Sequence, residues 1–107
     1  MVNFQNLGFQ AYSGGTQYFA LTAAMGTTPQ VIKTASARLC KIVNPGAAQT
    51  ATVSVYDTAS NSSSGAQLLW SGVLAAAEVI DIQIPAVHGL MVSASVAVTG
   101  SVLLTWV

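Results

Sequence analysis

The chain has 107 residues, of which 52% are hydrophobic and 6% charged, and its three basic and three acidic side chains cancel to a net charge of zero. This length is typical of one domain, and the high hydrophobic content excludes a disordered chain, which would combine few apolar residues with many charges. Three basic residues are too few for the positive surface that nucleic-acid binding requires. We therefore expect no nucleic-acid partner. Because chains without net charge tend to associate, we do expect protein partners.

The charged residues are confined to positions 33–81, so both ends of the chain are uncharged. Uncharged stretches of this kind are typical either of core strands or of surface that other subunits cover. Polar residues and glycines interrupt residues 82–107, which argues against a membrane-spanning helix and against a membrane partner. The N-terminus lacks the basic and apolar regions of a secretory signal, which predicts that the protein is made and kept in a cytoplasm until it is assembled or released.

The first fifteen residues differ in character from the rest. Phe4, Phe9 and Tyr12 are spread among Asn, Gln and Gly residues without a regular period. We interpret residues 1–15 as an N-terminal arm or linker whose three aromatic side chains are candidate interface residues, because interfaces concentrate their energy in a few large anchors. The alternative is a strand that packs on its own domain.

From residue 16 onward, period-2 alternation recurs between Gly, Pro and Asn turn signals, which is the pattern of short strands. We expect strands at residues 16–23, 30–34, 37–43, 50–57, 68–74, 78–85 and 88–94, and a hairpin over 96–107 that turns at Thr99 and Gly100. Asn44, Pro45 and Gly46 predict a turn, and residues 58–67 a polar loop. The pattern predicts an all-β fold, a single antiparallel β-sandwich over residues 16–107 that is jelly-roll- or immunoglobulin-like.

The alternation also predicts which side chains share a face of a strand. Ala51, Val53 and Val55 share one face of a strand, and Ile80, Ile82 and Ile84 share one face of another, which has the pattern of a half-buried strand. In residues 37–43 the same rule puts Arg38, Cys40 and Ile42 on one face and Leu39, Lys41 and Val43 on the other.

The sequence offers no constellation for catalysis. His88 is the one histidine, and no nucleophile motif accompanies it. Cys40 lies within a strand, where we expect a buried or half-buried structural residue. Glu78 and Asp81 are three apart and so point to opposite faces, and with Asp57 alone remaining there is no carboxylate cluster for a metal. We therefore expect no catalytic residues, no metal, no cofactor and no enzymatic activity.

Two segments carry a resemblance to a known class of protein. They are RLCKIVNPGAAQTATVSVYDTASNSSSGAQLLWSG (residues 38–72) and IPAVHGLMVSASVAVTGSVLLTWV (residues 84–107). The first combines an Asn-x-Gly-Ala-Ala turn, a Thr/Val strand ending in Tyr-Asp and a Ser/Gly loop. The second has a Gly-Leu strand and a final hairpin with an aromatic residue, Trp106, at its end. This order resembles small β-sandwich virion structural proteins of tailed bacteriophages, of the capsid decoration or cement type, although Pro45 departs from the usual turn.

The resemblance implies a structural protein of the virion that binds and stabilises the head. Its implied partners are the major capsid protein and copies of itself, as a homodimer or homotrimer. The alternative is a carbohydrate-binding or host-recognition module of a phage tail, for which Tyr56, Trp70 and Trp106 are the candidate aromatic residues. A subunit of a bacterial filament would show the same composition.

Overall fold

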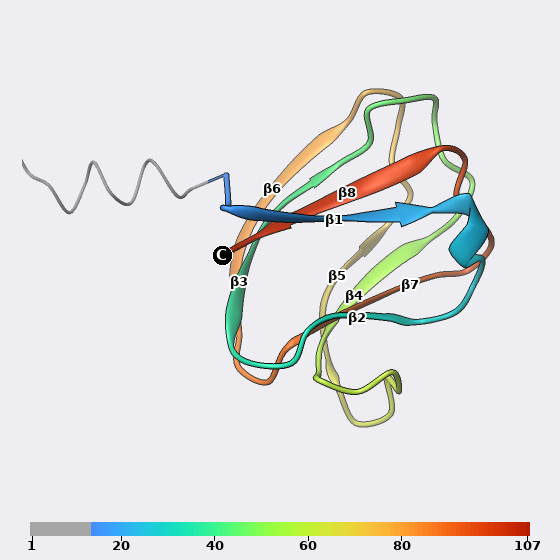
Figure 1. Ribbon diagram of the computed structural model, residues 1–107. Helices are drawn as coiled ribbons and strands as arrows, with labels where there is room; N and C mark the ends of the chain where they lie inside the picture. The colour runs from blue at the N-terminus through green and yellow to red at the C-terminus, as the bar shows by residue number, and fades with distance from the viewer. Residues whose placement is uncertain (1–13) are drawn as a thin grey trace, which may run out of the picture.

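The computed structural model describes residues 14–107, which form two four-stranded antiparallel sheets stacked as a sandwich (Figure 1). The strands are β1 (Gln17–Thr22), β2 (Gln30–Lys33), β3 (Ala37–Val43), β4 (Val53–Asp57), β5 (Gln67–Gly72), β6 (Val79–Ala86), β7 (Leu90–Ala94) and β8 (Ser101–Trp106). A short 3-10 helix, η1 (Ala23–Met25), follows β1. The all-β sandwich expected from the alternation is confirmed.

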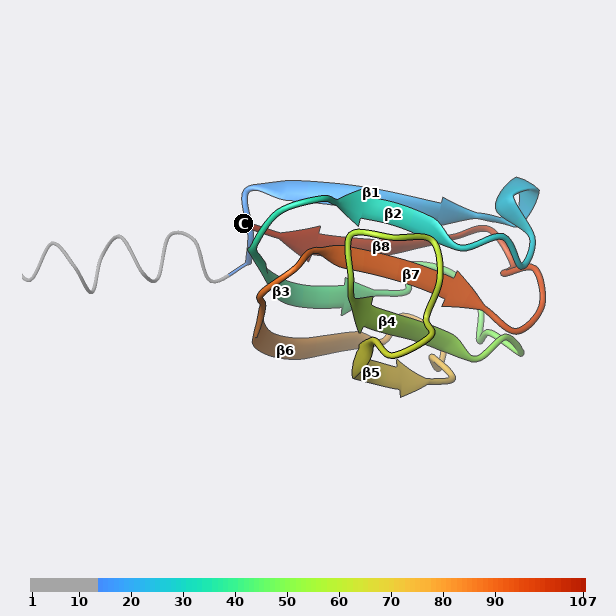
Figure 2. The ribbon, with the colours of Figure 1, turned by 90° about the horizontal axis from the view of Figure 1, so that it is seen from below.

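The strand order distinguishes between the two expected topologies. One sheet has the order β1-β8-β3-β6 and the other β2-β7-β4-β5, and the strands of the two sheets overlie each other in Figure 2. Every connection crosses from one sheet to the other except that between β4 and β5. This is the order of an eight-stranded jelly roll, whereas an immunoglobulin sandwich would place its first two strands in one sheet.

The expected hairpin over residues 96–107 is wrong. Only Ser101–Trp106 forms a strand, and it pairs with β1 on one side and β3 on the other. Residues 95–100 are a loop in which the side chain of Val98 is buried in the core. The partners of β8 are thus distant in sequence, so a local turn signal at Gly100 does not identify them.

Two of the predicted shared faces are confirmed, and both face the core. Ala51, Val53 and Val55 are fully buried. In β6 the three isoleucines pack against the same core, which lies between the sheets. Burial of one face per strand supplies most of the stabilisation of such a fold, at roughly 25 cal/mol per Å² of apolar surface.

The predicted faces of β3 are wrong beyond Cys40. Leu39 lies opposite Trp106 of β8 and Lys41 lies opposite Thr105, so Cys40 is an extra residue in β3 at this point. Such a bulge shifts the alternation by one residue, which is why Leu39 and Ile42 both face the core. Cys40 itself is fully buried, as expected.

Two buried polar side chains, Asn44 and Gln49, join three loops at one end of the sandwich. The Nδ2 group of Asn44 donates to the carbonyl oxygens of Ala47 and Ala75, both at 2.8 Å. The Nε2 group of Gln49 donates to Asn44 Oδ1 at 3.2 Å and to the carbonyl of Thr99 at 2.8 Å, and the Thr99 N–H donates back to Gln49 Oε1. These bonds hold the loops that precede β4, β6 and β8 together.

Candidate functional site

The predicted interface residues Phe4, Phe9 and Tyr12 lie outside the described residues, so their role stays a prediction. The described chain enters β1 beside the C-terminal end of β8 (Figure 1). The N–H of Thr16 donates to the carbonyl of Trp106 at 3.0 Å. A Cβ on Gly15 would lie 2.9 Å from the backbone of Trp106, so glycine permits this close approach.

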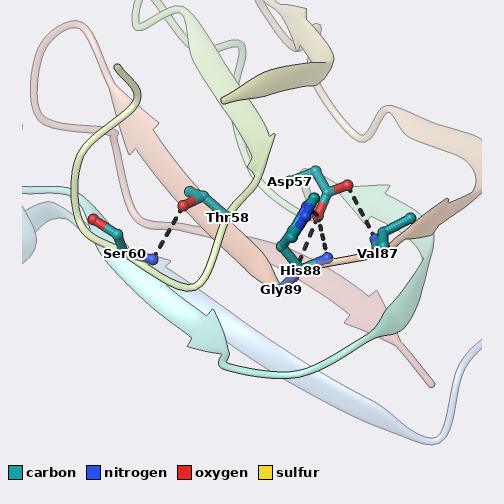
Figure 3. A network of polar contacts seen from close by, with 6 residues as sticks. All are labelled: Asp57, Thr58, Ser60, Val87, His88 and Gly89. Carbon is teal, nitrogen blue, oxygen red and sulfur yellow. Dashed lines mark hydrogen bonds and ion pairs between the residues drawn. The ribbon is translucent and has the colours of Figure 1, made fainter. Parts of the chain in front are cut away.

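A cluster of polar contacts surrounds Asp57 at the end of β4 (Figure 3). Its carboxylate accepts three backbone N–H groups of the turn between β6 and β7, from Val87 (3.0 Å), His88 (2.7 Å) and Gly89 (3.2 Å). The Nδ1 atom of His88 lies 3.6 Å from Asp57 Oδ1, but 74% of the histidine side chain is exposed, against 10% for Asp57. The carboxylate therefore serves to hold the turn.

The environment of Asp57 has opposing effects on its pKa. Burial raises the pKa of the carboxyl group, whereas the three backbone N–H bonds and the neighbouring imidazole of His88 lower it by more, so the pKa lies below its ordinary value of 3.8. Because the carboxyl group has a lower pKa in the folded state than in the unfolded state, it stabilises the fold at pH values above its unfolded pKa. This contribution is lost as the pH falls through the folded-state pKa.

Replacing Asp57 by asparagine tests this account. We expect a loss of about 1.5–3 kcal/mol in the free energy of unfolding at pH 7, because an amide cannot accept all three N–H bonds and presents a donor to them. The acid-induced loss of stability below about pH 4 should be shallower in the variant. Urea unfolding at pH 7 and at pH 3 measures both effects. Asp81→Asn, at an exposed carboxylate that accepts a bond from Gln83, is the matched control; an equal loss in both variants would contradict this role for Asp57.

The remaining carboxylates have separate structural partners. Glu78 Oε1 accepts the N–H of Ala75 at 2.8 Å, and Asp81 Oδ1 accepts a bond from the Gln83 amide at 2.8 Å. Within residues 14–107 no three His, Cys, Asp or Glu side chains group in a way that could hold a metal ion. No helix in that part of the chain has the length and apolar character needed to cross a membrane.

The outer face of the β1-β8-β3-β6 sheet carries a row of apolar side chains that crosses all its strands. Ala20 of β1 lies opposite Leu103 of β8, Leu103 lies opposite Val43 of β3, and Val43 lies opposite Val79 of β6. Val79 is 54% exposed, and the other three are half-buried. We name these four residues the outer row.

Two opposite charges lie next to the outer row. In the adjacent position along the strands, Lys41 lies opposite Asp81, so the two side chains offset each other. Tyr18, in the same position of β1, is 70% exposed. The face therefore has an uncharged apolar row with two opposite charges in the position beside it.

The other sheet has a comparable row, but the chain's own loop lies over it. Val31, Met91, Tyr56 and Leu68 are opposite one another across β2, β7, β4 and β5. The loop between β4 and β5 passes in front of β7 in Figure 2, and Met91 is only 1% exposed. Val31 and Leu68 at the two ends of this second row are exposed, at 36% and 45%, whereas its centre is covered. The outer row of the first sheet differs in that no loop of the described chain is seen to pass over it in Figures 1 and 2.

The Ser-rich loop that covers this face has its own internal bonds. The hydroxyls of Thr58, Ser60 and Ser62 each accept the backbone N–H two residues further on, at 3.0–3.2 Å. Hydroxyl residues stabilise turns in this way. The hydroxyl repeat of residues 58–64 therefore stabilises the loop, whereas the sequence pattern predicts only that the loop is polar.

A scan of protein-family models and searches of curated proteins and of solved structures found no match to this chain. The candidate site therefore depends on the geometry alone. Sequence reasoning missed the outer row, because its members lie on four strands and meet only through the register between them. The one signal that could have suggested it is the absence of charge in two of the strands that carry it, β1 and β8.

Proposed function

We propose that this chain is a non-enzymatic structural protein of a bacteriophage virion, a decoration protein that binds the head and stabilises it. The observation that carries the proposal is the outer row, Ala20, Leu103, Val43 and Val79, an uncharged apolar row that crosses all four strands of one sheet. Contiguous apolar surface on a small domain is typical of an interaction site, and depletion of charge is typical of the centre of an interface.

Two further observations support the proposal. The jelly-roll strand order is common in viral capsid domains, although a fold by itself does not define a function. The turn and strand order of residues 37–107 resembles that of small virion proteins. The proposed partners are the major capsid protein and further copies of this chain, and the proposed location is the virion.

A carbohydrate-binding module is the second candidate, because jelly rolls also occur in lectins. Of the aromatic residues expected to bind a sugar, Trp70 and Trp106 pack against the core, and Lys33 Nζ lies 5.0 Å from the centre of the Trp106 ring. Tyr18 is more exposed than either tryptophan, with 70% of its surface accessible. Binding to host glycans but not to heads would favour this candidate.

Replacing Val43 by aspartate tests the head-binding proposal. A charge in the middle of the outer row should weaken binding to purified heads of the encoding phage about tenfold or more, because an unpaired charge would be buried at the contact. Co-sedimentation with heads measures the affinity, and a thermal melt shows that the variant is folded. Val79→Asp, at the exposed end of the row, is a second variant that perturbs the core less.

Ser54→Asp is the matched control, because Ser54 lies on the outer face of the other sheet, where its hydroxyl is 3.0 Å from that of Ser71. We expect it to leave head binding unchanged. Head binding that is absent in the unaltered protein, or that is equal in all variants, would contradict the proposal.

A further inference from the structure

The sandwich has four edge strands, and they differ in how they are protected against pairing with another chain. Edge strands of soluble proteins usually carry charges, prolines, bulges or very short lengths that prevent such pairing. The edges here are β1 and β6 in one sheet and β2 and β5 in the other. Within the described residues, three of these edges have such features and one does not.

The protected edges are readily explained. β6 contains Asp81 and Pro85, and Gln83 has a positive φ of 52° where the strand bulges. β2 is four residues long, ends in Lys33 and has an irregular register. β5 ends in Gly72 and shifts its register against β4.

β1 has none of these features. Its sequence, QYFALT, contains no charge, proline or glycine, and all six residues pair with β8 in continuous register. The nearest charged residue along the chain is Lys33, in β2. A regular, uncharged edge of this length is a template for one more strand.

We infer that β1 pairs antiparallel with β1 of a second copy of this chain across a two-fold axis, which joins two four-stranded sheets into one of eight strands. A two-fold contact brings the same surface of both copies together. Opposite residues of an antiparallel pair point to the same face of the sheet. The two-fold axis must therefore pass midway between the two copies of one residue, so that this residue lies opposite itself, and cannot lie between two successive residue positions.

The outer row selects that position. With Ala20 on the axis, Ala20 of each copy lies opposite the other, and the two outer rows become one row across all eight strands. On the same face, Tyr18 lies opposite Thr22 of the second copy. On the inner face Phe19, which is half-buried at the open edge of the core, lies opposite Leu21 of the second copy. The net charge of zero adds no repulsion between the copies.

The inference goes beyond the proposed function and does not depend on it, because the dimer would form in purified protein without any head. Sedimentation equilibrium of the full chain over a range of concentrations should show a dimer. Ala20→Lys should weaken dimerisation about tenfold or more, because it places two like charges directly opposite each other. Val79→Lys puts the same charge at the other end of the outer row and should leave the dimer unchanged.

A cysteine at position 20 gives an independent readout if Ala20→Lys does not fold. Opposite residues in an antiparallel pair have Cα atoms about 4.5–5.5 Å apart, which lies within the range that a disulfide spans. Ala20→Cys should therefore form a covalent dimer on oxidation. Tyr18→Cys is the control, because the two copies of residue 18 would be four residues out of register, or roughly 13 Å apart along the strands. The native Cys40 is buried and is present in both variants.

A dimer that Ala20→Lys weakens, or that Ala20→Cys but not Tyr18→Cys traps, supports the inference. A monomer at high concentration, a trimer, or a dimer that neither change affects would overturn it. A monomer that dimerises only after removal of residues 1–13 would also overturn it, because the edge would then be covered by the chain's own N-terminal residues. Head binding in each case is measured separately, so either proposal can fail without the other.

Discussion

Replacing Asn44 by aspartate is expected to lower the free energy of unfolding by about 3–5 kcal/mol at pH 7. The two side chains have nearly the same shape, but only the amide can donate. Asn44 is fully buried, and its Nδ2 group donates to the carbonyl oxygens of Ala47 and Ala75. In the variant a carboxylate oxygen would face these two carbonyl acceptors, and a negative charge would be buried with the neutral Gln49 amide as its hydrogen-bond donor.

The effect should depend on pH in a defined direction. Burial beside two carbonyl oxygens raises the pKa of such a carboxylate above its unfolded value, so protonation on acidification should restore part of the lost stability relative to the unaltered protein. Urea unfolding of both proteins between pH 4 and pH 7 measures this difference. Asn61→Asp makes the same change in the exposed Ser-rich loop and should alter stability by no more than about 0.5 kcal/mol. Equal stability of both variants would show that the Asn44 amide does not hold the loops.

Replacing Gly89 by alanine should cost about 3 kcal/mol or more, because a methyl group has no room there. A Cβ at this position would overlap the carbonyl oxygen of Lys33, and it would lie 2.9 Å from that of Thr58 and 3.1 Å from the Cα of Ala59. These are backbone atoms, so relief requires the end of β2 and the start of the Ser-rich loop to move. The N–H of Gly89 would also be displaced from Asp57.

Thermal unfolding measures the cost of the Gly89 substitution, and the melting temperature should fall by roughly 12 °C or more for a domain of this size. Gly46→Ala is the matched control, because an added Cβ at Gly46 meets nothing within 4 Å and its backbone does not have a positive φ. That change should be neutral or slightly stabilising. A melting temperature that falls equally in both would contradict the close approach at Gly89.

The Asn44 and Gly89 loops lie at opposite ends of β6, and neither contributes to the outer row. Asn44 follows β3 and lies beside the start of β6, where its N–H donates to the carbonyl of Glu78. Gly89 lies beyond the other end of β6. At temperatures where they remain folded, variants at these sites should retain any surface interaction. Substitutions in the outer row and in β1 should have the opposite effect, with little loss of stability and a marked loss of binding.

Much of the fold could be predicted from local sequence. The alternation of small apolar and hydroxyl residues in β4 predicts which side chains are buried, and Val53 and Val55 are fully buried. The bounds of β3 agree with the prediction at both ends. These features depend only on the two-residue period of a strand and on the local chemistry of turns, which act over a few neighbouring residues.

The sequence by itself determined that the chain is a charge-poor, all-β domain, because composition and period-2 alternation are local properties. It left the jelly-roll and immunoglobulin topologies open, since both use short strands and similar turns. Only the tertiary structure placed Ala20, Val43, Leu103 and Val79 in one row, and only it made β1 an edge. Strand register and sheet order come from pairing between distant segments, where one extra residue at Cys40 changes which side chains face the core.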